Sequence, residues 1–125
     1  MDVAGASIRD RLSEGDRRET DASDIVAAMA LTDFKVLGTV LNCLDEVDPV
    51  VVSHAAHALM QVGKKRPELF DSHRDFLLER LAKPKQWEIG EQLPKILVRT
   101  HLSERQVEVL AKTLETNLAS KWSIV

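Results

Sequence analysis

A short pattern, a tryptophan or proline with an aliphatic residue two positions later, recurs along this chain of 125 residues. Trp87-Glu88-Ile89 reappears as Trp122-Ser123-Ile124 at a spacing of 35, and Pro49-Val50-Val51 precedes the first of these by 38. Each copy follows an apolar stretch, within residues 40–44, 77–81 and 107–118. Because a single helical hairpin cannot bury its own apolar face, a period of this size predicts a stack of hairpins.

The composition also favours helices over strands. Hydrophobic residues make up 44% of the chain but aromatic residues only 4%, and there is no tyrosine. A core of leucine, valine and alanine suits helix packing better than sheet packing, so we predict an all-α fold. The single Cys43 has no internal disulfide partner and no leader or membrane-spanning segment is evident, so we expect a cytoplasmic protein.

Residues 48–63, DPVVVSHAAHALMQVG, give the clearest helix. Asp48 is placed to cap it and Pro49 to occupy its first position, where a missing N–H costs nothing. Gly63 is expected to end it. Helical spacing predicts a buried stripe formed by Val51, Ala55, Ala58, Leu59 and Val62.

Further helices are expected on either side. Ser23 and Thr32 are candidate caps for two of them, and Ser103 with Gln106 forms a capping box for a third. Pro94 should kink the helix that begins near Trp87. Residues 1–22 are expected to form a weakly ordered arm or a short helix over about residues 3–12, separate from a repeat domain over residues 23–125.

The segment DPVVVSHAAHAL resembles the HEAT repeat family, an armadillo-like class of helical repeats. Asp-Pro, an aliphatic residue, two alanines and Ala-Leu open the second helix of a HEAT unit, and Leu93-Pro94 departs from this pattern in the next unit. The resemblance covers roughly residues 23–125. It implies a right-handed α-α superhelix, a solenoid of about two and a half HEAT-like hairpins.

The charge distribution bears on the class of partner. The net charge is −3, with four basic and seven acidic residues in 1–24 but nine basic and six acidic in 64–101. Nucleic-acid affinity comes mainly from neutralising phosphates, so this balance argues against a general nucleic-acid partner.

Two histidines stand out as candidate metal ligands. His54 and His57 are three positions apart on the same predicted helix, but His73 and His101, the other histidines, follow different signals. We therefore interpret His54 as a residue flanking the buried stripe and His57 as a surface residue, and predict no metal site and no cofactor. Cys43 lies at the edge of an apolar stripe and is interpreted as a packing residue.

Trp87 and Glu91 suggest an enzymatic alternative. DNA alkylation repeat glycosylases are also built from HEAT-like units and line their groove with aromatic residues and a carboxylate. WEIGE at residues 87–91 is similar, and Trp122 would supply a second indole. In that case Glu91 would stabilise positive charge that develops on the sugar, although the chain is short for such a groove.

The preferred interpretation is a non-catalytic protein-interaction or scaffold module that presents a helical surface to a partner protein. That surface is predicted to comprise His57, Gln61, Trp87, Glu91, Lys95 and Arg99. The helix expected to begin at Trp122 has hardly started when the sequence stops, so the last hairpin would expose an apolar face. We therefore expect either a longer natural chain, truncated here at its C-terminus, or self-association through that end.

Overall fold

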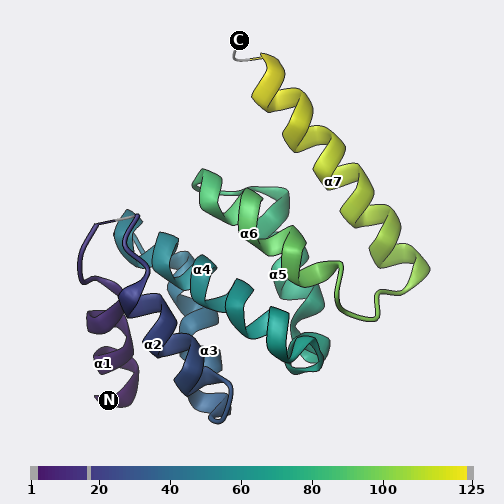
Figure 1. Cartoon of the computed structure of the whole chain (residues 1–125). Coiled ribbons are helices and arrows are strands. Elements are labelled where there is room, and N and C mark those ends of the chain that lie inside the picture. Colours follow the sequence, from purple (N-terminus) through teal and green to yellow (C-terminus); the bar gives the residue numbers. More distant parts are fainter. Residues whose placement is uncertain (1–2, 17, 124–125) are drawn as a thin grey trace.

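The computed structural model describes residues 3–16 and 18–123, and the side chains of residues 8–16 and 18–117. Within these ranges it contains only helices, as Figure 1 shows, so the predicted all-α fold is confirmed. The elements are α1 (Val3–Leu12), α2 (Asp21–Ala30), α3 (Phe34–Asn42), η1 (Cys43–Asp45), α4 (Pro49–Lys65), η2 (Pro67–His73), α5 (Arg74–Ala82), α6 (Trp87–Leu97) and α7 (Glu104–Ser123), where η marks a 3-10 helix.

The central element is α4, which packs against α2 on one side and α6 on the other. A second set of contacts joins α1 to α3 and α5 to α7, and consecutive helices pair as α1 with α2, α3 with α4, and α5 with α6. Helices α2, α4 and α6 therefore contact one another in series, and α2 also contacts α3.

The position of α4 explains its composition. Its predicted stripe is buried, with Val51 and Leu59 at 0% exposure, but so are Val52 and Ala56 on other sides of the helix. Asp48 Oδ1 accepts a hydrogen bond from Val50 N at 2.9 Å and Pro49 begins the helix, as predicted. The small alanines allow neighbouring helices to approach α4 closely on several faces, which places it at the centre of the core.

Several predicted helix ends are wrong. The α4 helix continues past Gly63 to Lys65, because Gly63 lies in contact with α6 and not in a turn. Ser23 does not cap α2 but lies inside it and is buried. The cap of α3 is Asp33 and not Thr32, since Asp33 Oδ1 accepts a hydrogen bond from Lys35 N at 2.9 Å. Pro94 lies inside α6, which runs through that residue to Leu97.

The N-terminal residues pack against the rest of the core. Ile8 and Leu12 of α1 are 2% and 0% exposed, and α1 contacts α2, α3 and α4. Arg9 also forms an ion pair with Glu46, which follows η1. Because α1 fills a position next to α3, the packed unit begins well before Ser23.

The last helix is attached mainly along α5. Leu110 is buried at 6% exposure, and Asn117 Nδ2 donates to the Leu81 carbonyl at 3.2 Å. Beyond these contacts much of its apolar surface is open, since Val107 and Val109 are 50% and 41% exposed. Figure 1 shows α7 extending away from the other helices toward the C-terminus.

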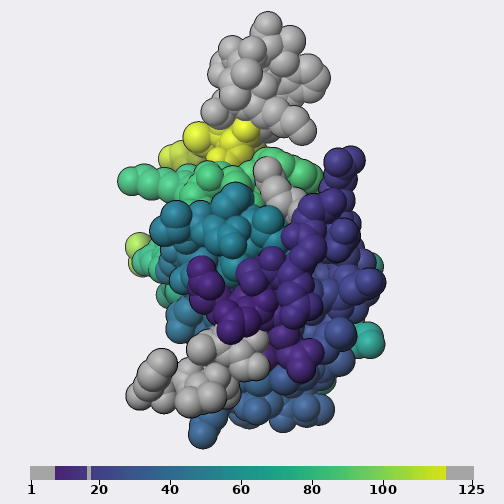
Figure 2. Space-filling model, turned by 90° about the vertical axis from the view of Figure 1, so that its left-hand side faces the viewer, coloured from purple at the N-terminus to yellow at the C-terminus, as the bar shows by residue number. Residues whose placement is uncertain are grey.

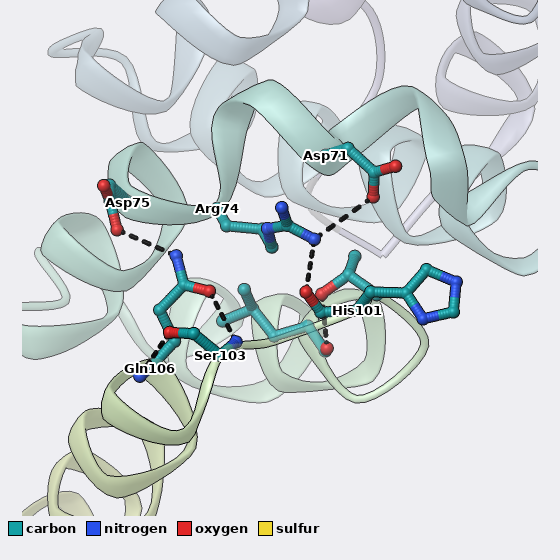
Figure 3. Close-up of polar contacts among 8 residues, drawn as sticks. Asp71, Arg74, Asp75, His101, Ser103 and Gln106 are labelled. Atoms are coloured by element: carbon teal, nitrogen blue, oxygen red, sulfur yellow. Dashed lines mark hydrogen bonds and ion pairs between the residues drawn. The ribbon is translucent and has the colours of Figure 1, made fainter.

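Polar contacts hold the turn that leads into α7, as Figure 3 shows. Gln106 Oε1 accepts from Ser103 N at 2.9 Å and Ser103 Oγ accepts from Gln106 N at 3.1 Å, which confirms the predicted capping box. Gln106 Nε2 also donates to Asp75 Oδ1 at 3.1 Å, and Arg74 donates to the His101 carbonyl. The start of α7 is therefore joined to α5 by hydrogen bonds.

The predicted start of a new helix at Trp122 is wrong. Trp122 lies near the end of α7, whereas Trp87 is the first residue of α6 and Pro49 the first residue of α4. The spacing of 38 thus relates two equivalent helix starts, but the spacing of 35 does not. A membrane-spanning helix, which would need greater length and apolarity, is absent from the described part of the chain.

Candidate functional site

A groove of about 750 Å³ lies where the α1–α2 loop faces the first turns of α4 and α6. Figure 2 shows α1 and this loop, in purple and indigo, on the same side of the molecule as α4 in teal and α6 in green. The lining residues are Asp16, Arg18, Glu19, Thr20, Val50, Ser53, His54, His57, Trp87, Glu88, Glu91 and Gln92. Three elements that are distant in sequence therefore build one open site.

One wall of the groove is fixed by His54. Its ring is 1% exposed, with Nδ1 2.7 Å from the Leu12 carbonyl oxygen and Nε2 2.7 Å from the Asp16 carbonyl oxygen. Both carbonyls can only accept, so a ring with one N–H satisfies one of them and a ring with two satisfies both. His54 therefore flanks the predicted stripe but is itself buried, because the α1–α2 loop covers that face of α4.

His57 lies deeper than predicted and has a fixed orientation. Ser23 Oγ donates to the Thr20 carbonyl at 2.8 Å and lies 2.8 Å from His57 Nδ1. Since the one hydroxyl proton of Ser23 is used by Thr20, Nδ1–H of His57 donates to Ser23 Oγ and Nε2 is left as an acceptor. His57 is half-buried and not fully exposed, because α2 packs against this part of α4.

Burial also affects the charge of His57. Partial burial is the main cause that lowers the pKa of this imidazole below its usual 6.5, and the Asp24 carboxylate opposes the shift. The nearby His54, Lys95 and Lys64 lower it further. The neutral ring is therefore the dominant form at pH 7, and His57 contributes a polar contact to the groove without a positive charge.

The start of α6 forms the opposite wall. Gln86 Nε2 donates to the Pro49 carbonyl and to Glu88 Oε1, both at 3.0 Å, which ties the first turn of α6 to the start of α4. Glu88 is 5% exposed, whereas the Trp87 indole is 65% exposed at the edge of the groove. Glu91 lies one helical turn further on, and its carboxylate is 3.9 Å from Lys95 Nζ.

The six residues predicted for the partner surface are divided by the structure. His57, Trp87 and Glu91 line the same groove. Gln61 lines a second, smaller depression of about 340 Å³ between α2 and α4, where it donates to Asp24. Lys95 and Arg99 line neither of these two depressions, and Arg99 donates instead to the Lys95 carbonyl at 3.0 Å.

The position of the α1–α2 loop in the site has no clear signal in the sequence. Asp16 and Glu19 lie in a polar segment without helical periodicity, so no pattern predicted their position. The one usable signal was Gly15, which adopts a φ of +76° and marks a tight turn. In that turn Asp16 Oδ1 accepts from Arg18 N at 2.8 Å.

Metal chemistry finds no support in the geometry of the described residues. No group of three or more histidine, cysteine, aspartate or glutamate side chains within that part is arranged to hold an ion. Cys43, also considered as a reactive group, is 4% exposed, and burial raises the pKa of its thiol to about 11. Its position agrees with its interpretation as a packing residue.

No family model matches this chain, and neither a curated protein nor a solved structure gives a significant match. The groove and its residues are therefore interpreted from their own geometry and charge.

Proposed function

We propose that this chain is a non-catalytic protein-interaction module built as a right-handed solenoid of HEAT-like hairpins. In this proposal the hairpins are α1–α2, α3–α4 and α5–α6, and α7 begins a fourth. The pattern of helix contacts supports this proposal, because α2, α4 and α6 contact one another in series, as a helical repeat requires. The start of α4 at Pro49 and of α6 at Trp87 supports the period of 38.

The observation that carries the proposed function is the exposed Trp87 at the edge of the groove. Tryptophan is enriched among residues that dominate binding energy at protein interfaces, and here 65% of it is open to solvent. It lies beside hydrogen-bonding groups from three elements that are already held in place. Such a preformed site can bind a short segment of another protein with little loss of its own conformational entropy.

A displayed library of random peptides tests this proposal directly. We expect selection against the whole chain to enrich peptides that lose binding to Trp87→Ala. The matched control is Phe34→Ala, because Phe34 also begins a helix and is 76% exposed, but lies outside the groove. If no peptide is enriched, or if both variants bind the enriched peptides equally, the groove is not a peptide site.

A second candidate is a glycosylase-like activity on alkylated DNA. The observation in its favour is that Trp87 and Glu91 line one groove. Release of an alkylated base from duplex DNA, lost in Glu91→Gln, would establish it. The acidic residues around Glu91 disfavour this candidate because they repel phosphates, so we expect no base release.

Self-association through the C-terminal end is retained as a proposal. The support is the exposed apolar surface of α7, where Val107, Val109 and Leu114 are 50%, 41% and 36% exposed. Light scattering across a concentration series tests it. A mass that stays at one chain throughout would remove this proposal without affecting the groove.

A further inference from the structure

We propose that the groove between the α1–α2 loop, α4 and α6 receives a cationic side chain, a lysine or an arginine, from the partner segment. This inference rests on the proposed interaction function and narrows the class of partner to a basic peptide. It is carried by the balance of charges around the groove and by the position of an exposed indole beside a carboxylate.

The charge balance of the lining is acidic. Four carboxylate residues line the groove: Asp16 and Glu19 from the loop, and Glu88 and Glu91 from α6. The lining has one arginine or lysine, Arg18. Two of the four are already engaged. Asp16 Oδ1 accepts from backbone N–H groups of its own turn, and Glu88 is buried. Glu19 and Glu91 are the exposed pair, one on each wall.

These two carboxylates have capacity for a ligand. The contact of Glu91 with Lys95, at 3.9 Å, is too long for a hydrogen bond, and exposed pairs of this kind are weak. Glu19 makes no ion pair with any side chain that the structure describes. Its carboxylate lies close to Gly15, where the missing Cβ leaves room for it. A guanidinium or ammonium group in the groove could therefore form a charge-assisted hydrogen bond with the Glu91 carboxylate, while Glu19 adds negative charge on the opposite wall.

The indole of Trp87 adds a second attraction for a cation. Trp87 and Glu91 are four residues apart on α6, so their side chains lie on the same face of the helix. A cation held over an indole face gains electrostatic stabilisation, and tryptophan is the most favourable aromatic residue for this contact. An uncharged polar side chain of the same size would gain much less from either group.

The groups nearest to the site do not cancel this attraction. Burial keeps His57 mainly neutral at pH 7, since it lowers the pKa of the ring. Lys95 lies outside the lining but close to it, since Nζ donates to Gln92 Oε1 at 3.3 Å and is 3.9 Å from Glu91 Oε1, so its charge competes with the ligand. Removal of its charge by Lys95→Gln should therefore strengthen binding of a cationic segment, whereas a partner with an acidic segment would bind that variant less well.

The test uses a fluorescein-labelled peptide of alternating arginine, serine and glycine, and a matched peptide in which citrulline replaces every arginine. Citrulline keeps the size and hydrogen-bonding ability of arginine but carries no charge. Fluorescence anisotropy with the whole chain measures both affinities. We expect the affinity for the arginine peptide to be at least about tenfold higher than the affinity for the citrulline peptide. Added salt should weaken that binding, because the contacts are ionic and solvent-exposed.

Variants place the binding in the groove. Glu91→Gln and Trp87→Ala should each lower the affinity for the arginine peptide by roughly threefold to tenfold. The matched control for the carboxylate is Glu108→Gln, an exposed glutamate on α7, and the control for the aromatic residue is Phe34→Ala. Thermal unfolding of each variant shows whether the fold is retained, and Trp87→Phe should recover part of the affinity.

The outcomes separate this inference from the function on which it rests. If the peptide library is enriched in sequences that depend on Trp87 but carry no basic residues, the groove binds peptides and the cationic inference is wrong. Equal affinity for the arginine and citrulline peptides would also show that the cationic inference is wrong. If neither library nor arginine peptide binds, the interaction function itself fails.

Discussion

Gly63 of α4 lies directly against Ile96 of α6. A Cβ atom at Gly63 would be 3.2 Å from Ile96 Cγ1 and 3.3 Å from Ile96 Cγ2, closer than most contacts of that kind. Ile96 is completely buried, so it has little room to move away. The glycine therefore sets how closely the two helices that carry the groove can approach each other.

Gly63→Ala should destabilise the fold although alanine is the better helix former. We expect a loss of about 1–3 kcal/mol in the free energy of unfolding, because a methyl group is forced into a packed interface. Urea denaturation measures it. Gly38→Ala is the matched control, since nothing lies within 4 Å of the Cβ it would add, and it should gain about 0.5–1 kcal/mol. A gain at both positions would show that α4 and α6 are not in close contact.

Replacement of His54 should release the α1–α2 loop. His54→Leu places an apolar side chain of similar size in the core and leaves the Leu12 and Asp16 carbonyls without this partner. We expect a loss of about 1–3 kcal/mol in stability, together with faster trypsin cleavage after Arg18 under native conditions. Unchanged cleavage in a destabilised variant would mean that other contacts hold the loop.

The lowered pKa of His57 predicts a pH dependence of stability. The unfolded chain takes up a proton at His57 near pH 6.5, while the folded chain takes it up only at lower pH. The unfolded state therefore binds more protons between the two pKa values, and stability falls as the pH drops through this window. The measurement is the difference in unfolding free energy between the native chain and His57→Gln, above and below pH 6.5. A difference independent of pH would contradict the shift.

Cys43 should be unreactive in the native protein. With a thiol pKa of about 11, roughly one molecule in ten thousand carries the thiolate at pH 7, and the side chain is only 4% exposed. A chromogenic disulfide reagent should therefore react at a rate set by unfolding, and rapidly in denaturant. Fast reaction of the native chain would place Cys43 at the surface.

Local patterns predicted the helices and much of the core correctly. Asp48 and Pro49 begin α4, Ser103 and Gln106 form the capping box of α7, and Leu59 is buried, because each of these features depends on residues within a few positions. The face of a helix can be predicted from its own spacing. What covers that face cannot, since the covering residues come from other segments.

His54 illustrates this limit. Its helical position placed it beside the stripe, but its partners Leu12 and Asp16 lie about forty residues earlier in the chain. The same limit explains Trp122, whose resemblance to Trp87 lies in three letters of sequence and not in its place within a helix. Half of the predicted surface, His57, Trp87 and Glu91, shares one groove because α4 and α6 are neighbours.

Because α4 contacts both α2 and α6, neither neighbour can separate without exposing α4. Backbone amide hydrogens in the middle of α4 should therefore exchange with deuterium only when the stacked helices open together, and last in the chain. Helix α7 carries fewer buried side chains, so its amide hydrogens should exchange through smaller, local openings. Residues that hold the groove thus belong to the most cooperative unit of the protein, while α7 belongs to a weaker one.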